Sequence, residues 1–396
     1  MTTHRRARRL AGALTALVLA AGGGALAGLV VVPAGAADLT LAEAGARSGR
    51  TIGVAVGSSV LTRDAAYAAI VDREFASVAP EVEFRFDSTQ IARGTFWWVA
   101  IDRIVDWAAQ HGKKVRGYPL MQGAAQAAWF VSLNPDQRRG EMVKHLDAVL
   151  GRYGHVVDTW DLVSEVYLDN GSLRPSAMQV TGSDWVELAY RTARAAAPDT
   201  RFCYSDYGIE DWASPKTQAV YAMVKDFKAR GVPLDCVSLQ SHFVQGLTHP
   251  ASMPQTMAAF AALGVDVELS ELDVTGDAKQ AEVYAQVARE CREQPRCTGI
   301  TLFGVRDIDS WTSSQTPLLF DRDGARKPAY TAFRDALLGV PPTTTTVTPT
   351  TSPTTSKPTT TKPTTTKPKT TRTKKTTTVC RTRKNSQVTC KVVTRR

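Results

Sequence analysis

Short apolar runs alternate with longer amphipathic stretches along residues 38–340. The short runs are rich in β-branched and aromatic residues, a pattern typical of buried β-strands. The longer stretches repeat apolar residues at spacings of three and four, which is typical of helices that pack on one face. The pattern predicts strands at 51–57, 82–87, 114–120, 159–165, 201–206, 236–243, 265–274 and 299–307.

Helical periodicity separates these strands, most clearly in the segments 96–112, 184–197 and 281–293. Eight strands, each followed by a helix, within about 300 residues are typical of a (β/α)8 barrel, whereas a doubly wound sheet usually has fewer strands. We therefore predict an α/β fold of the TIM-barrel class, formed by residues 38–340 as a single domain.

Polar and charged residues recur at the carboxyl ends of the predicted strands. In a barrel these ends converge on one face, which is where active sites lie. An alternative interpretation is that some of them cap helices, as Asp87 followed by a serine would. The residues at strand ends are Asp87, Glu165, Asp206, Gln240, His242, Glu271, Asp273 and Asp307.

The two ends of the chain have compositions unlike a folded core. Residues 1–36 have the basic start, the apolar run and the Ala-Gly-Ala site that are typical of a cleaved signal peptide. The apolar run at 10–32 is also long enough for an uncleaved anchor. Residues 341–378 consist almost entirely of Thr, Pro and Lys, which predicts a disordered, semi-extended linker. We therefore expect a secreted, extracellular protein.

The excess of positive charge belongs to the C-terminal end. The chain has a formal net charge of +10, but residues 341–396 contain 13 Lys and Arg residues and no acid. Once these charges and the four arginines of residues 1–36 are subtracted, the central domain has a net charge of −7. This balance argues against nucleic acid as a partner. It favours binding of the short basic tail, residues 379–396, to anionic wall polymers or lipid head groups; a solvated spacer without a ligand is the alternative.

Six cysteines in an exported chain predict disulfides. Proximity in the sequence favours two pairs, Cys291 with Cys297 and Cys380 with Cys390. The second pair would close a small hairpin in the basic tail.

Cys203 and Cys236 lie inside two predicted strands, where a third bridge and two buried free thiols are equally consistent with the pattern. The chain has no CxxC motif and no histidine cluster with metal-ligand spacing. Neither a metal nor an organic cofactor is therefore expected for the chemistry.

Two glutamates end predicted strands, Glu165 in WDLVSE and Glu271 in VELSE. Burying a carboxylate without a partner is costly, so a carboxylate at the end of an apolar strand needs a reason. Hydrolysis of a glycosidic bond uses such a pair: one carboxyl group stays protonated to donate to the leaving oxygen, and the other stays ionised to attack or to activate water. Two glutamates at one barrel face therefore predict a glycoside hydrolase.

Ordered motifs along nearly the whole domain resemble glycoside hydrolase family 10, whose best-known members are endo-β-1,4-xylanases. WDLVSEV (160–166) resembles the Trp-Asp-Val-Val-Asn-Glu acid/base motif of the family, and ELSELDV (268–274) resembles its Thr-Glu-Leu-Asp nucleophile strand. TIGVAVGSS, GKKVRGYPL, CYSDYG, SLQSHF and the closing segment 299–330 resemble further family motifs in the same order.

The resemblance implies a role for each matching residue. Glu165 would be the acid/base and Glu271 the nucleophile of a retaining double displacement, with their carboxyl groups roughly 5–5.5 Å apart. Gln240 and His242 would lie beside Glu271, with His242 bonded to it, and Asp273 would hold that histidine.

The resemblance also implies that Trp311 stacks on a sugar ring; ordinary core packing is the alternative. Several sugar-binding positions depart from the family pattern: Val82, Arg85, Tyr118, Gln122, Gly123, Ser164, Ser205 and Phe303. The expected substrate-binding or supporting residues are Arg85, Tyr118, Gln122, Ser164, Tyr207, Gln240, His242, Asp273, Phe303 and Trp311.

We therefore expect a secreted, monomeric, retaining β-glycosidase that acts on a polysaccharide, by default an endo-1,4-β-xylanase acting on xylan. The departures leave two alternatives. One is a related hydrolase of a different glycan, because a changed set of hydroxyl-binding groups alters discrimination strongly. The other is a catalytically weak carbohydrate-binding or wall-associated module.

Overall fold

The computed structural model describes residues 39–123, 125–341, 376–382 and 388–394. Two compact units divide the chain, Met1–Thr343 and Thr344–Arg396. The predicted signal peptide and nearly all of the predicted linker lie outside the described residues. None of the described helices combines the length and apolarity that crossing a membrane requires.

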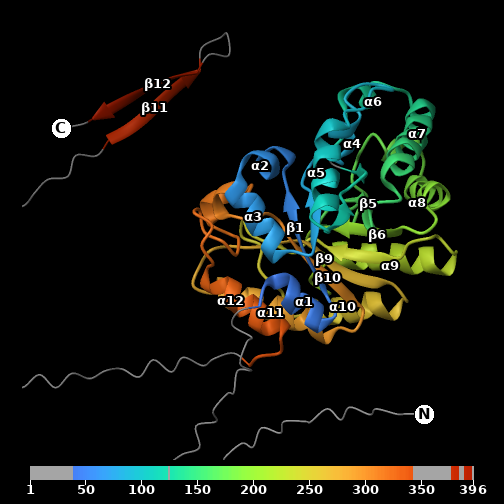
Figure 1. Cartoon of the computed structure of the whole chain (residues 1–396). Coiled ribbons are helices and arrows are strands. Elements are labelled where there is room, and N and C mark those ends of the chain that lie inside the picture. Colours follow the sequence, from blue (N-terminus) through green and yellow to red (C-terminus); the bar gives the residue numbers. More distant parts are fainter. Residues whose placement is uncertain (1–38, 124, 342–375, 383–387, 395–396) are drawn as a thin grey trace, which may run out of the picture. The chain divides into compact units, whose positions relative to one another are not determined.

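The first unit is the predicted (β/α)8 barrel, with eight parallel strands at its centre and helices around them (Figure 1). Pairing of β9 with β10 closes the barrel. Two short strands, β4 (Met121–Gln122) and β8 (His242–Phe243), extend it beside β5 and β9. In order around the barrel, the eight strands are β1 (Thr51–Val56), β2 (Ser77–Pro80), β3 (Lys114–Gly117), β5 (Thr159–Ser164), β6 (Arg201–Asp206), β7 (Cys236–Leu239), β9 (Asp266–Val274) and β10 (Cys297–Leu302).

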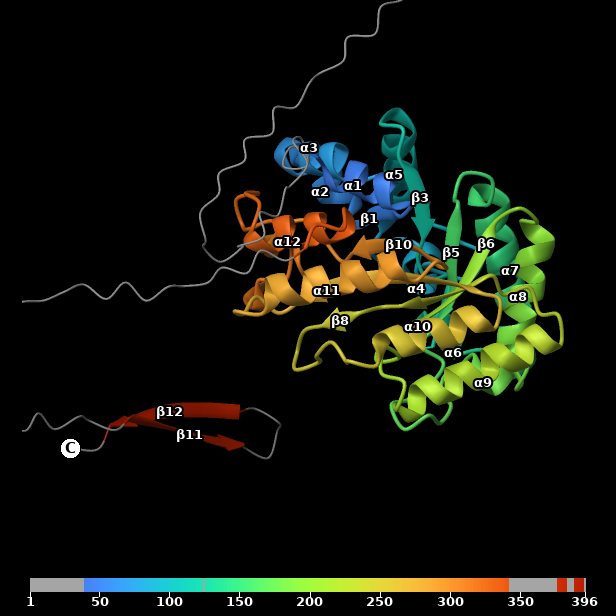
Figure 2. The ribbon, with the colours of Figure 1, turned by 90° about the horizontal axis from the view of Figure 1, so that it is seen from below.

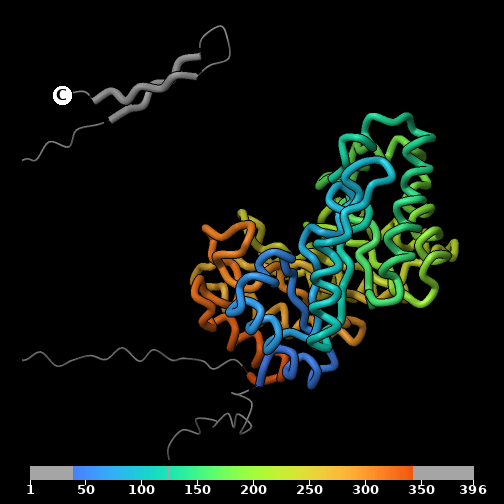
Figure 3. The backbone as a smooth tube through the Cα atoms, turned by 45° about the horizontal axis from the view of Figure 1, so that its top comes forward, coloured from blue at the N-terminus to red at the C-terminus, as the bar shows by residue number. Residues whose placement is uncertain are grey.

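The ends of the barrel domain meet, because β1 pairs with β10. Figure 3 shows the blue start of the domain beside its orange end, and Figure 2 shows α11 and α12 side by side on the outside. The helices are α1 (Leu41–Ser48), α2 (Ser58–Arg63), α3 (Ala65–Glu74), α4 (Phe86–Thr89), α5 (Val99–Gln110), α6 (Ala128–Val131), α7 (Pro135–Tyr153), α8 (Trp185–Ala196), α9 (Pro215–Ala229), α10 (Met253–Ala262), α11 (Gln280–Glu293) and α12 (Pro328–Leu337), with 3-10 turns at Gln179–Thr181, Asp307–Asp309 and Ser313–Gln315.

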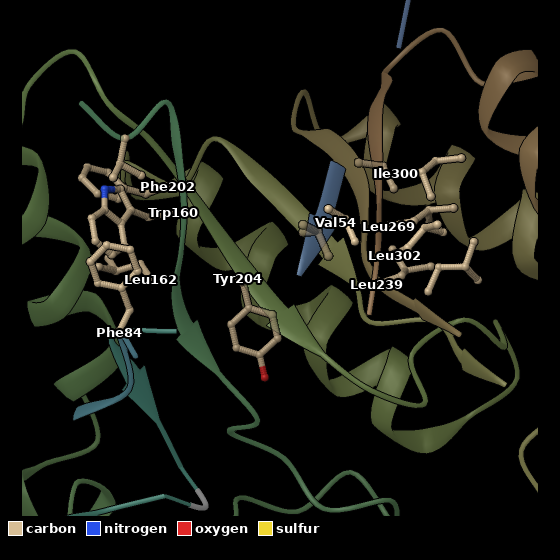
Figure 4. Close-up of a cluster of buried hydrophobic side chains, with 14 of the residues drawn as sticks. Val54, Phe84, Trp160, Leu162, Phe202, Tyr204, Leu239, Leu269, Ile300 and Leu302 are labelled. Carbon is tan, nitrogen blue, oxygen red and sulfur yellow. The ribbon is translucent and has the colours of Figure 1, made fainter. Parts of the chain in front are cut away.

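Alternate residues of β5 point to opposite faces of the strand and have different buried partners. Trp160 and Leu162 pack with Phe84 and Phe202 in one buried cluster (Figure 4), and the ring centroids of Phe84 and Trp160 are 4.5 Å apart. Gly117 on the neighbouring strand makes room for this indole, because a Cβ there would lie 2.0 Å from a Trp160 ring atom. The opposite face of the strand presents buried Asp161, which accepts a hydrogen bond of 2.7 Å from Arg116.

One predicted strand is wrong. Residues 82–87 form turns and the start of α4, and the second strand is Ser77–Pro80 instead. The alternating apolar residues that predicted a strand, Phe84 and Phe86, are buried by packing on Trp160 and Phe130. Asp87 therefore does not end a strand; it lies in the first turn of α4, 2.8 Å from Arg85.

Other predicted strands are longer than the observed ones. The strand predicted at 114–120 ends at Gly117, and the one predicted at 299–307 ends at Leu302. Asp307 consequently starts a 3-10 turn, where its carboxylate pairs with Lys327 at 3.0 Å. Segment 236–243 forms two strands, β7 and β8, rather than one.

The predicted Cys291–Cys297 disulfide is confirmed. Cys203 and Cys236 also form a disulfide, which decides between the two alternatives that the sequence leaves open. They are direct partners in the register of β6 and β7, so the strand pairing brings their side chains together.

In the second unit, β11 (Thr376–Thr382) pairs antiparallel with β12 (Val388–Thr394). Cys380 and Cys390 are opposite each other in that register. The predicted hairpin is therefore present in the backbone, whereas the Cys380–Cys390 bridge concerns side chains outside the described part of the chain.

Candidate active site

A cavity of about 430 Å³ lies at the carboxyl ends of the barrel strands, and nine predicted site residues line it together. Both glutamates belong to this set, one from the end of β5 and one from β9. The nine residues are Arg85, Gln122, Glu165, Tyr207, Gln240, His242, Glu271, Phe303 and Trp311.

Three other predicted site residues lie behind the cavity wall. Tyr118 is buried and its hydroxyl donates to the Ser270 carbonyl at 2.6 Å. Ser164 is buried beside Gln240, with 3.5 Å between its Oγ and the Gln240 amide nitrogen. Asp273 is fully buried and supports the residues that face the cavity.

Glu271 is held through a chain of side chains that leads away from the cavity. Its Oε2 is 3.0 Å from His242 Nε2, and the other ring nitrogen, Nδ1, is 2.9 Å from Asp273 Oδ1. The second oxygen of Asp273 accepts a 2.7 Å hydrogen bond from the Trp311 indole. The contacts expected between Glu271, His242 and Asp273 are therefore present, and Trp311 extends the chain.

These contacts determine the charge of His242. Burial alone would lower its pKa, but the hydrogen bonds and charges of Asp273 and Glu271 outweigh burial and raise the pKa of His242 to about 10. The histidine is therefore an imidazolium at neutral pH and donates from both nitrogens. Burial raises the pKa of Glu271, while the hydrogen bond and charge of His242 act in the opposite direction.

Glu165 is anchored by its backbone as well as by its side chain. It has a left-handed backbone, with φ of 57°, and its carbonyl accepts a 2.9 Å hydrogen bond from Arg174 Nε. Gln122 Nε2 donates to Glu165 Oε1 at 2.7 Å. The side-chain amide oxygen of Gln122, Oε1, is buried and has no hydrogen-bond partner among the described residues.

The residue after Gln122 fits the same arrangement. A Cβ on Gly123 would lie 2.5 Å from the Glu165 carbonyl oxygen, so the backbone approaches Glu165 too closely for a side chain. The two departures Gln122 and Gly123 are thus adjacent parts of one contact with Glu165.

Aromatic rings form one side of the cavity. Trp311 is 50% exposed, which rules out the alternative of ordinary core packing. Its ring centroid lies 5.3 Å from that of His242, and Phe303 lies 5.1 Å from the same histidine. The exposed indole face can lie against the C–H face of a sugar ring.

Two cationic side chains near the cavity, those of Lys216 and Arg174, do not lie at strand ends. The sequence pattern therefore did not identify them as site residues. Lys216 is fully buried on α9, 2.8 Å from Asp206 and 3.2 Å from the centre of the Tyr207 ring. Burial raises the pKa of Asp206 to about 7, although Lys216 acts in the opposite direction. Arg174 donates to the Tyr207 hydroxyl at 3.0 Å. Both cations therefore position site residues from outside the strands.

The sequence also missed three cavity-lining residues, Val244, Gln245 and Leu247. They lie in the loop after β8, beyond the QSH motif, and neither periodicity nor a strand end distinguishes them.

One group of possible metal ligands occurs in the described residues, Cys203, Cys236 and Glu268. The two sulfur atoms are bonded to each other, so they do not fit a metal in this state.

The chain is similar in sequence to known proteins. A family model described as Glycosyl hydrolase family 10 matches residues 40–336. Endo-1,4-beta-xylanase 2 of Claviceps purpurea is 33% identical over 264 residues, covering 66% of this chain and 80% of that protein. Exoglucanase XynX of Acetivibrio thermocellus is 33% identical over 315 residues, covering 73% of this chain and 29% of that protein.

Solved structures are also similar. The endo-1,4-beta-xylanase XylE of Penicillium canescens superposes with a TM-score of 0.72 at 29% identity, covering 77% of this chain and 99% of that structure.

Proposed function

The chain belongs to glycosyl hydrolase family 10, and from this premise we propose that it is a secreted, retaining endo-1,4-β-xylanase with Glu165 as acid/base and Glu271 as nucleophile. That it is a glycoside hydrolase of the endo-xylanase type follows from the family. We propose, beyond this, that the substrate is xylan, that the anomeric configuration is retained, and that Glu165 and Glu271 have the roles given above.

In the first step, a Glu271 oxygen attacks the anomeric carbon as the bond to the glycosidic oxygen breaks. Glu165 gives its proton to that oxygen, so the leaving sugar departs as a neutral alcohol. The product is a covalent ester between the glycone and Glu271. The His242 imidazolium, bonded to Glu271, orients the carboxylate and favours its ionised form.

In the second step, Glu165 is a carboxylate and takes a proton from water. The water oxygen attacks the anomeric carbon from the side that the leaving group vacated, and the bond to Glu271 breaks. Two inversions give net retention, and Glu165 regains its proton. Each carboxyl group thus begins the next cycle in its original state.

The observation that carries this proposal is the difference between the surroundings of two carboxyl groups in one cavity. Glu271 is bonded to a cation held by Asp273, which suits an anionic nucleophile. Among the described residues, the Glu165 side chain accepts one hydrogen bond, from the neutral amide of Gln122, which suits a group that alternates between acid and base.

Secretion is supported by the sequence of residues 1–36 and by the two disulfides of the barrel, because disulfides persist in oxidising compartments. We further propose that the protein is a monomer and that its basic tail binds anionic wall polymers.

A second candidate function is hydrolysis of a different β-glycan. Two residues near Glu165 depart from the family pattern: Gln122 lines the cavity, and Ser164 lies buried behind its wall, beside Gln240. A relative of this chain is named an exoglucanase, which makes cellulose a second substrate to test. A catalytically weak binding module is the remaining alternative.

Product release from xylan, arabinoxylan, cellulose, galactan and arabinan tests the proposal, with wild type and Glu271→Ala side by side. We expect turnover of xylan by wild type, loss of that turnover by at least a thousandfold in the variant, and products that retain the β configuration in an early NMR spectrum. Turnover of another glycan alone would identify the second candidate. Binding without any turnover would identify the binding module.

A further inference from the structure

A second cavity of about 710 Å³ adjoins the active-site cavity. Phe243 and residues 245–249 form one side, and the end of β9 with the first half of α11 forms the other. The two cavities share Gln245 and Leu247 in their linings. We name this second hollow the branch cavity; the proposed chemistry uses no other residue of its lining.

The wall between the cavities is strained and held in place. Gln245 has φ of 54°, a left-handed conformation that costs energy in a residue other than glycine. Its N–H donates to Gln315 Oε1 at 2.9 Å, and the Thr275 hydroxyl is 3.1 Å from the same oxygen. Strain maintained by surrounding contacts is common where a backbone is shaped to clamp a ligand.

The lining of the branch cavity combines apolar and polar surface. Leu247 is 47% exposed, and Phe243 and Val283 add further apolar area. Lys279 and Glu282 are exposed there, and neither side chain has a hydrogen-bond or ion-pair partner among the described residues. Apolar area beside free donors and acceptors matches a sugar, which presents C–H groups and hydroxyls together.

The charge of the lining selects between kinds of sugar. The lining contains one lysine, Lys279, and two carboxylates, those of Asp277 and Glu282. Its histidine, His249, is already paired with Glu290 at 2.8 Å. The excess of carboxylates disfavours a uronic acid and favours a neutral pentose or hexose.

We propose that the branch cavity binds a neutral monosaccharide branch of the glycan whose backbone lies in the active-site cavity, an inference that rests on the proposed function. The backbone has to pass between Glu165, after β5, and Glu271, in β9. Glu165 and Glu271 line the active-site cavity but not the branch cavity, so a backbone that remains between the carboxylates does not fill the branch cavity. A substituent attached sideways reaches it across Leu247.

Calorimetric binding in a Glu271→Gln background tests the inference. The ligands are a linear β-1,4-xylo-oligosaccharide and the same backbone with a single arabinose branch. The test variant is Lys279→Ala/Glu282→Ala. The matched control is Lys225→Ala/Asp147→Ala, which removes one cation and one carboxylate from exposed positions of α9 and α7 that line neither cavity.

The test variant should bind the branched ligand about tenfold more weakly, as loss of one or two hydrogen bonds implies, and the linear ligand as before. The control should bind both ligands like its parent. A second variant, Thr248→Trp, adds an indole to the lining of the branch cavity from an exposed loop position and should weaken the same ligand selectively.

Equal affinity of the test variant and its parent for the branched ligand would overturn the inference. Equal weakening for both ligands would also overturn it, because the cavity would then hold a backbone unit. The proposed function is assessed separately by hydrolysis of the linear ligand with Glu271 intact. Absence of that hydrolysis, with selective branched binding retained, would reject the xylanase proposal and leave the branch cavity standing.

Discussion

At the residue scale, the two glutamates differ through their neighbours rather than through their position in the sequence. Glu271 is bonded to the His242 cation, which Asp273 holds from the other side. Glu165 is bonded to Gln122, and its backbone is fixed by Arg174. Each neighbour therefore gives a way to test one carboxyl group separately.

Substitution of Gln122 by Leu should affect acid catalysis in particular, because it removes the hydrogen bond that orients the Glu165 carboxyl group. On xylo-oligosaccharides, whose leaving groups need a proton, we expect kcat/KM to fall about tenfold, the equivalent of about 1.4 kcal/mol. On a dinitrophenyl xylobioside, whose leaving group departs unprotonated, it should stay nearly constant. An equal loss on both substrates would mean that Gln122 supports the cavity only as packing.

His242 should link stability to pH. Its pKa in the folded protein is about 10 against an ordinary 6.5, so its charge stabilises the fold fully below pH 6.5 and loses this effect as the pH rises through about 10. The difference in melting temperature between wild type and His242→Gln should therefore be largest at pH 6 and should shrink by pH 10.5. A difference that is constant over this range would contradict the raised pKa.

At the element scale, strand pairing determines what the four barrel cysteines do. Cys203 and Cys236 are register partners on β6 and β7 and lie 33 residues apart, whereas Cys291 and Cys297 are six residues apart at the end of α11 and the start of β10. A longer loop loses more unfolded-state entropy when it is closed.

Replacing both cysteines of a pair by Ser should thus cost more for the longer loop. We expect the free energy of unfolding to fall by about 4 kcal/mol for Cys203→Ser/Cys236→Ser and by about 2 kcal/mol for Cys291→Ser/Cys297→Ser. Urea titrations of both variants and of wild type measure this. A larger loss for the shorter loop would show that strain or packing dominates over loop entropy.

At the scale of the whole molecule, the barrel and the basic tail carry charge of opposite sign. The barrel contains the proposed catalytic machinery, and residues 341–396 contain 13 cationic side chains without an acid. We therefore expect the barrel to catalyse and the tail to retain the protein on anionic surfaces.

Deletion of residues 341–396 should leave kcat/KM on soluble substrate unchanged, because no described residue of the cavity belongs to that segment. Retention on an anionic wall polymer should be lost in the deletion variant, and 0.5 M salt should release the full-length protein. Unchanged retention after deletion would reject tail docking and favour the solvated spacer.

The sequence by itself determined the barrel, the order of its strands and most of the residues that face the active-site cavity. Hydrophobic periodicity specifies strands and helices locally, and the carboxyl ends of parallel strands meet wherever eight of them close into a barrel. The strand-end pattern identified Glu165, Glu271 and His242, and the family motifs added the role expected of each.

Only the tertiary structure decided the remaining features, because they depend on contacts between distant segments. Alternation at 82–87 predicted a strand, yet Phe84 and Phe86 achieve the same burial from a turn and a short helix. The Cys203–Cys236 bridge depends on strand register, and the site roles of Lys216 and Gln245 depend on which loops and helices meet. No local sequence pattern predicts such contacts, because they form only when the closed barrel brings distant segments together.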